Sequence, residues 1–198
     1  MNHILNLFIS PKDTWSTIRD SDYSIISLYL RFVCFISLIP VLSWHYGATR
    51  VGWIINDHTI KLTAESSFQI MTLFYLSILS GILFLGFMFH WMSGTYGATK
   101  STISKGVSIS AFACTPMFLI GITGLYPILW LDILLACTAA CTTIYLVYIG
   151  VPIMFDIPKE QGFLYASAMM AVGLVMCAAL LGITVILWEM GAMPVFTD

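Results

Sequence analysis

Hydrophobic residues occur in this chain as long runs with almost no charge, separated by shorter polar segments, and one of the runs is long enough for two spans. A membrane-spanning helix needs about 20 mostly apolar residues, because the hydrocarbon core is about 30 Å thick and a helix rises about 1.5 Å per residue. Strands of a membrane barrel would instead alternate polar and apolar residues over about ten positions, and these continuous runs do not alternate. The pattern predicts an all-α polytopic bundle of five membrane-spanning helices, at about 24–46, 68–90, 106–124, 128–150 and 163–188.

The third and fourth spans come from one apolar stretch of about fifty residues, Gly106–Phe155, whose single charge is Asp132. As one helix this stretch would be about 75 Å long, far more than a bilayer is thick. The sequence Gly124-Leu125-Tyr126-Pro127 predicts the reversal, because glycine often follows the end of a helix and proline suits the first turn of the next.

Residues 1–23 precede the first span and lack a cleavable signal pattern, so we expect the first span to stay attached. The segment Ser10–Asp13 is typical of a helix start, and Trp15 and Ile18 give one side an apolar edge. We expect a short interfacial helix on the cytoplasmic surface of the membrane, with an ordinary polar lead-in as the alternative. The whole chain, 1–198, is predicted to be a single membrane domain.

The composition agrees with a membrane location. Hydrophobic residues make up 59% of the chain and charged residues 9%, whereas soluble domains carry about 25% charged residues. The net charge of −2 and the absence of a basic run argue against a nucleic-acid partner. All five cysteines lie inside apolar segments, where we expect reduced packing residues.

Lysine and arginine predict the orientation, because they favour cytoplasmic segments. The segments on the amino-terminal side carry Lys12, Arg19, Lys100, Lys105 and Lys159. The segments on the other side carry only Arg50 and Lys61. We therefore expect a cytoplasmic amino terminus and a carboxyl terminus on the opposite side of the membrane.

The candidate polar sites are the ionisable side chains in or beside the spans: Arg31, His90, Asp132 and Glu189. A charge at the centre of a membrane helix costs about 2.5–3.5 kcal/mol on insertion scales. Arg31 is near enough to the cytoplasmic side to extend its side chain to the headgroups, and Asp132 and Glu189 lie near the outer surface. Asp132 could instead pair with Arg50 or Lys61, and His90 is a candidate contact for a lipid phosphate.

Pro116 interrupts the third predicted span. It removes a backbone hydrogen bond from the Phe112 carbonyl, which Thr115 or a neighbouring helix could replace. The resulting kink could line a cavity, or it could be a simple packing bend. Several pairs of small residues, such as Ser77 with Gly81 and Gly173 with Cys177, predict tight helix contacts within the chain or between copies.

Catalytic patterns are absent from the sequence. It contains no glycine-rich phosphate loop, no paired histidines on a helix and no Gly-x-Ser-x-Gly elbow. We therefore predict no enzymatic activity, no cofactor and no metal site.

Several motifs resemble the Yip (Ypt-interacting-protein) domain family of five-span membrane proteins, in particular its bacterial inner-membrane branch. They are Phe8-Ile9-Ser10-Pro11 followed by Trp15 and Ile18, Ala113-Cys114-Thr115-Pro116-Met117-Phe118-Leu119, Gly124-Leu125-Tyr126-Pro127 with Trp130-Leu131, Tyr148-Ile149-Gly150-Val151-Pro152, and Lys159-Glu160-Gln161-Gly162. The resemblance makes Tyr148 and Gly150 candidate structural sites. It also implies a multi-pass protein of the bacterial inner membrane, in which the charge bias described above would place the carboxyl terminus in the periplasm. Eukaryotic relatives are associated with Rab-type GTPases and membrane traffic, a role that does not transfer to a bacterium.

Two functions remain open from the sequence. The first is a scaffold or adaptor that contacts the lipid bilayer and binds lipids, other membrane proteins or a second copy of itself. The second is a small transporter or channel with a polar path near Pro116 and Asp132, to which the Tyr145 and Tyr148 pair could contribute.

Overall fold

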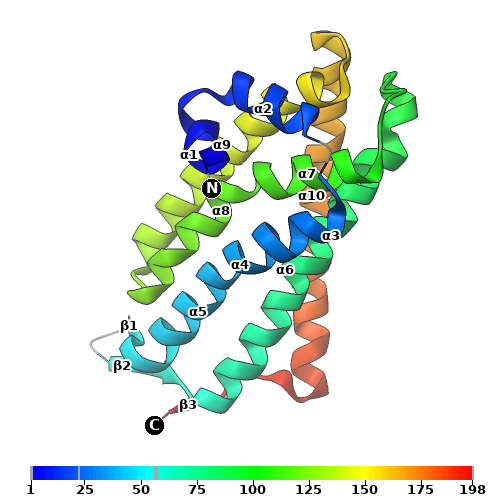
Figure 1. Ribbon diagram of the computed structural model, residues 1–198. Helices are drawn as coiled ribbons and strands as arrows, with labels where there is room; N and C mark the ends of the chain where they lie inside the picture. Colours follow the sequence, from blue (N-terminus) through cyan, green and yellow to red (C-terminus); the bar gives the residue numbers. More distant parts are fainter. Residues whose placement is uncertain (1, 22, 56–57, 198) are drawn as a thin grey trace.

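The computed structural model describes residues 2–21, 23–55 and 58–197, and it confirms an all-α bundle with five helical segments able to span a membrane (Figure 1). These segments are Ile25–Val51, Ala64–Tyr96, Ile103–Leu125, Leu129–Phe155 and Lys159–Ala192. The two ends of the bundle are called the sheet end and the turn end. The sheet end holds three short strands, and the turn end holds the connection between the fourth and fifth spans (Figure 1).

The first span is irregular along its length. Its parts are α3 (Ile25–Leu28), the π-helix η1 (Tyr29–Val33), α4 (Cys34–Ile36), α5 (Leu38–Tyr46) and a second π-helix η2 (Gly47–Val51). Pro40 lacks the N–H that would bond to Ile36, and α4 ends at that residue. The Ser37 hydroxyl donates to the Val33 carbonyl at 2.7 Å and so satisfies a group near the break.

The second span is α6 (Ala64–Met92), followed by the short 3-10 helix η3 (Ser93–Tyr96). Two tyrosine hydroxyls join α6 to the first span: Tyr29 donates to the Leu79 carbonyl at 2.7 Å, and Tyr75 donates to the Cys34 carbonyl at 3.2 Å. Such bonds stabilise helix pairs in lipid, where no water replaces them.

The third span breaks at the predicted proline into α7 (Ile103–Ala113), α8 (Thr115–Ile120) and the 3-10 helix η4 (Gly121–Leu125). The Thr115 hydroxyl donates to the carbonyl of Ala111 at 3.4 Å, one residue before the carbonyl that the sequence suggested. Pro116 itself is buried, and α8 packs against α9. The kink is therefore inside the packed bundle.

Helices α6 and α7 cross closely because glycine faces glycine. A Cβ atom built on Gly106 would collide with the Gly86 carbonyl oxygen, and one built on Gly86 would lie 2.7 Å from the Val107 Cα. Backbones approach this closely only where side chains are missing.

The last two spans are α9 (Leu129–Phe155) and α10 (Lys159–Leu187), which ends in the π-helix η5 (Trp188–Ala192). The turn between them contains Asp156 in the left-handed conformation, with φ of 54°. Below the turn, Gly162 of α10 packs on Pro152 of α9, where an added Cβ would lie 2.8 Å from the proline Cβ.

A small antiparallel sheet, which the sequence did not predict, closes the other end. Its strands are β1 (Trp53–Ile55), β2 (His58–Leu62) and β3 (Phe196–Thr197), in that order. The strands are too short to produce a clear alternating pattern, and β3 lies at the far end of the chain from its partner β2.

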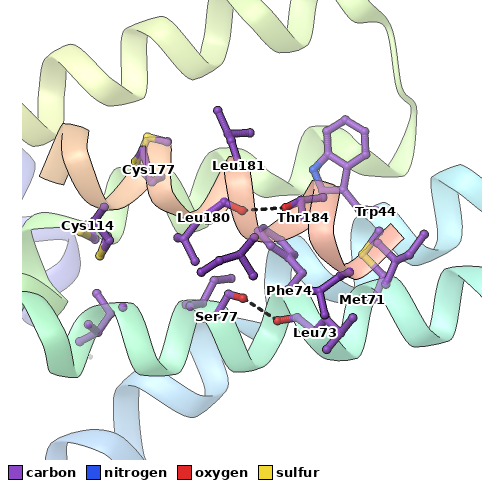
Figure 2. A pocket seen from close by; sticks show the side chains of 18 of the residues that line it. Trp44, Met71, Leu73, Phe74, Ser77, Cys114, Cys177, Leu180, Leu181 and Thr184 are labelled. Atoms are coloured by element: carbon purple, nitrogen blue, oxygen red, sulfur yellow. Dashed lines mark hydrogen bonds between the residues drawn. The ribbon is translucent and has the colours of Figure 1, made fainter. Parts of the chain in front are cut away.

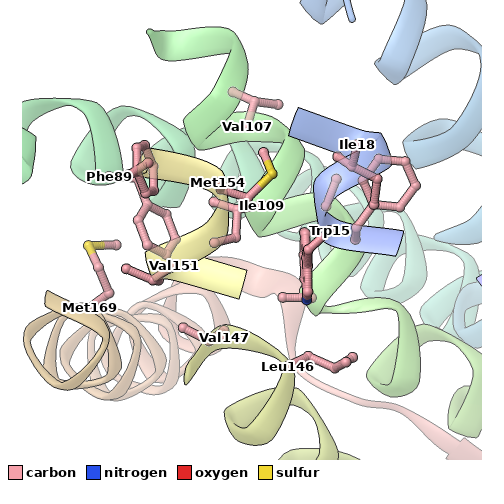
Figure 3. Close-up of a cluster of buried hydrophobic side chains, with 14 of the residues drawn as sticks. Trp15, Ile18, Phe89, Val107, Ile109, Leu146, Val147, Val151, Met154 and Met169 are labelled. Carbon is pink, nitrogen blue, oxygen red and sulfur yellow. The ribbon is translucent and has the colours of Figure 1, made fainter. Parts of the chain in front are cut away.

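The amino-terminal segment forms two helices, α1 (Asn2–Ile9) and α2 (Pro11–Asp20), rather than one. The Ser10 side chain makes no capping bond, although Pro11 does begin α2. Leu7, Trp15 and Ile18 are buried, and α2 packs against α9 beside the core residues Leu146 and Ile109 (Figure 3). The segment is thus an integral part of the bundle and more than a surface helix, because three of its apolar side chains leave the surface.

Candidate functional site: a groove between α6 and α10

Helix α10 is attached to the bundle at its turn end. The Tyr165 hydroxyl donates to the Phe89 carbonyl of α6, and its ring stacks on Tyr96 with centroids 5.0 Å apart. Tyr148 of α9 shares a hydrogen bond of 2.8 Å with the Ser167 hydroxyl. These contacts fix the first third of α10.

The sheet end of α10 is attached separately. The Thr63 N–H donates to the Val195 carbonyl at 2.9 Å, and the Val195 N–H donates to the Ser66 hydroxyl at 3.0 Å. Strand β3 pairs Phe196 with Leu62 of β2, immediately before α6. The end of the chain is therefore tied to the start of α6.

Between these two attachments α10 stands away from α6, and a groove of about 720 Å³ separates them (Figure 2). Ligand pockets in proteins are typically about 300–1,000 Å³. One wall is α6 from Ile70 to Leu85, and the opposite wall is α10 from Met176 to Leu187 together with Trp188 of η5. Trp44 of α5 and Cys114, Met117 and Phe118 at the α7–α8 break form the floor.

The groove offers almost no hydrogen-bonding groups to an occupant. None of its lining residues is charged. Its two hydroxyl side chains bond to their own helices, Ser77 to the Leu73 carbonyl at 2.8 Å and Thr184 to the Leu180 carbonyl at 2.8 Å (Figure 2). An ion, a sugar or a column of water would find too few partners there, whereas hydrocarbon needs none.

A second hollow of about 540 Å³ is lined only by α6 and α10. It shares Ser77, Gly81 and Met176 with the groove, so the two hollows lie next to each other along the seam between the helices. Over this length the side chains of α10 mostly face outward, and Leu174 and Leu181 are 73% and 71% exposed.

The small-residue pairs at this seam were predicted to be tight contacts, and the structure places them differently. A Cβ on Gly81 would only touch the Met176 side chain, at 3.6 Å, and one on Gly173 would meet nothing within 4 Å. Gly81 therefore lines the groove and Gly173 lies outside it, so neither makes a tight helix contact within the chain, and contacts between copies stay a prediction. The small residues are visible in the sequence. The sequence alone does not show whether a small residue lies at a tight helix contact or beside a cavity.

The predicted polar residues do not come together in one site. Arg31 is exposed within η1, and Glu189 is exposed within η5 at the other end of the bundle. His90 is partly buried near the turn end, with its Nδ1 3.4 Å from the Ser101 hydroxyl.

Asp132 lies in the first turn of α9 and is partly buried, with one carboxyl oxygen enclosed and without a hydrogen-bond partner. Within the described parts of the chain it forms no ion pair with Arg50 or Lys61. The charge pair considered from the sequence is thus not formed.

The motif residues Tyr148 and Gly150 both have packing roles. The Tyr148 hydroxyl joins α9 to Ser167 of α10, as described above. Gly150 accommodates the indole ring of Trp15, because an added Cβ would lie 2.7 Å from the ring atom Cε2.

The ion pairs of the described residues gather at the turn end, outside the spans. Arg19 donates to Asp20 at 2.8 Å, and Lys100 lies 3.6 Å from Asp156. The hydrogen bond from Arg19 holds the pKa of the exposed Asp20 carboxyl below its usual value. Among the residues described, no group of three or more histidine, cysteine or acidic side chains could hold a metal ion.

Comparison with known proteins decides the family. The model of the Yip1 domain matches residues 5–180, from α1 to the middle of α10. The chain belongs to the Yip1 domain family. It is 33% identical over 192 residues to the inner membrane protein YohC of Escherichia coli strain K12, covering 96% of this chain and 98% of that protein. YohC of E. coli strain CFT073 matches with the same identity and coverage, and no solved structure matches this Yip1 family chain.

Proposed function

We propose that this Yip1 family protein is a non-enzymatic scaffold of the bacterial inner membrane, and that it binds other membrane components sideways through the groove between α6 and α10. The observation that carries the proposal is the position and chemistry of this hollow. The groove is larger than the hollow beside it, and its lining is apolar. One of its walls is α10, whose outer face is exposed along the span. An apolar hollow between the membrane-spanning parts of two helices suits a partner that diffuses within the bilayer.

Photo-crosslinking in native membranes tests this function. A photoreactive amino acid at Met176, in the groove, should give discrete adducts with lipid or protein. The same residue at Leu174, on the same helix but outside the groove, should give mainly diffuse background. Equal adduct patterns from the two positions would contradict a binding role for the groove.

The orientation belongs to the same proposal. Lysine and arginine counts favour a cytoplasmic turn end and amino terminus, with the sheet end and carboxyl terminus in the periplasm. A reporter that is active only in the cytoplasm should work when fused before residue 1 and fail when fused after residue 198. The reverse pattern would overturn the orientation and leave the groove unaffected.

A small transporter or channel is the second candidate function. The unpartnered carboxyl oxygen of Asp132 favours it, as does the buried Thr143 hydroxyl, which also has no partner. Both residues lie on one side of α9, because a separation of eleven residues is close to three full helical turns. They are about 16 Å apart along the helix axis. The buried Ala139 lies between them on this side, so a hydrogen-bonded path would have to cross apolar packing.

A further inference from the structure

We infer that the groove between α6 and α10 binds the acyl chains of a bilayer phospholipid, held as a fixed part of the fold. This inference rests on the proposed function and names the partner class. Three properties of the groove lead to it: its cross-section, its lining chemistry and the way α10 is held.

The mean cross-section of the groove suits a thin, extended ligand. The α6 wall runs from Ile70 to Leu85, about 22 Å at 1.5 Å per residue, so a volume of about 720 Å³ gives a mean cross-section of about 33 Å². A helix with side chains is about 10 Å wide and needs roughly 80 Å². An extended hydrocarbon chain, with carbon contacts at about 4 Å, needs roughly 20 Å². One or two extended chains fit within this section, and a helix from a second copy seated at the open side is the occupant that the crosslinking test below distinguishes from lipid.

The lining chemistry selects hydrocarbon from among thin ligands. The Ser77 and Thr184 hydroxyls already bond to their own helices, and no charged side chain faces the space. Leucine, isoleucine and methionine make up more than half of the lining residues, among them Met71, Met176 and Leu180, and flexible thioether side chains adapt well to a chain without fixed shape.

The attachments of α10 explain why the helix does not close the groove by itself. Tyr165 fixes it to α6 at the turn end, and the pairing of β3 with β2 fixes it at the sheet end. A helix anchored at both ends cannot shift sideways onto α6 without breaking one of these contacts. An empty space would lose dispersion contacts on every wall, so bilayer hydrocarbon fills it.

The test compares groove-filling variants with a matched control. In Gly81→Phe the new ring enters the groove from α6, and in Cys177→Phe it enters from α10. In Gly182→Phe the ring points into open space, where nothing lies within 4 Å of an added Cβ. Each protein is purified, reconstituted with a synthetic diacyl phosphatidylethanolamine that carries a photoreactive group in its chain, and illuminated. Melting curves check that every variant folds.

The wild type and Gly182→Phe should retain a phospholipid in native mass spectra after detergent exchange and should be labelled at groove residues such as Met176. Gly81→Phe and Cys177→Phe should lose both signals while keeping their melting temperature. Unchanged lipid retention in both Gly81→Phe and Cys177→Phe would overturn the inference. Photolabels spread evenly over the exposed face of α10 in the wild type would also overturn it. Crosslinks from Met176 in cells to a protein only, without lipid, would also overturn it while the scaffold function stood.

Discussion

Replacing Gly106 with leucine is expected to prevent the bundle from assembling. The position has no room for any side chain, since even a Cβ would collide with the Gly86 carbonyl oxygen of α6. Overpacking against flexible side chains typically costs about 1–3 kcal/mol, but here the obstacle is backbone, and the two helices must separate. We expect the free energy of unfolding to fall by more than that range. The fall should be seen as aggregation or as a strongly lowered melting temperature in mild detergent.

Gly173→Leu is the matched control for this change. It places the same side chain in another span, at a position where an added Cβ meets nothing within 4 Å. It should melt within a few degrees of the wild type. If Gly106→Leu melted like Gly173→Leu, the close crossing of α6 and α7 would be wrong.

Truncating Trp15 to alanine should detach the amino-terminal helices from the bundle. The side chain is 0% exposed (Figure 3). It packs on Gly150 of α9. Removing a buried tryptophan costs about 3–5 kcal/mol when the site cannot collapse. We expect a lowered melting temperature, and protease cleavage in residues 1–23 that the wild type resists. Trp91→Ala, at a tryptophan that is 68% exposed, should change neither.

A conservative change at the same position separates packing from hydrogen bonding. The Trp15 indole N–H is buried without a partner, so Trp15→Phe removes a polar group that forms no hydrogen bond. It should be much milder than Trp15→Ala. Gly150→Leu should reproduce the Trp15→Ala phenotype, and adding it to Trp15→Ala should cost less than the two separate effects together, because the residues are in contact. Full additivity would contradict that contact.

The five spans could be predicted because the thickness of the hydrocarbon core sets the length of each apolar run. The break at Pro116 was also predictable, since the missing N–H is a local property. Burial of Trp15 was not, because the residue that receives it, Gly150, lies far along the chain. The sequence around Trp15 shows only an apolar edge, which fits a membrane surface and a bundle equally well.

The groove could not be predicted for a related reason. It depends on two attachments of α10, one made by Tyr165 with Phe89 and one made by β3 with β2. Each joins segments distant in sequence, and β3 is only two residues long. Apolar runs show which helices face lipid or core, but every lipid-facing helix has the same composition whether it touches its neighbour or stands away from it.

Methyl NMR in nanodiscs is the most direct test of the central claim. The claim is that the groove between α6 and α10 is open to lipid, whereas the core of the bundle excludes both lipid and water. Met71 and Met176 line the groove, whereas Met154 and Met169 are each 1% exposed in the core. The groove methyl groups should show cross-relaxation with lipid acyl protons, and the core methyl groups should show none with either lipid or water. Water contacts at Met154, or lipid contacts missing at Met176, would contradict this account.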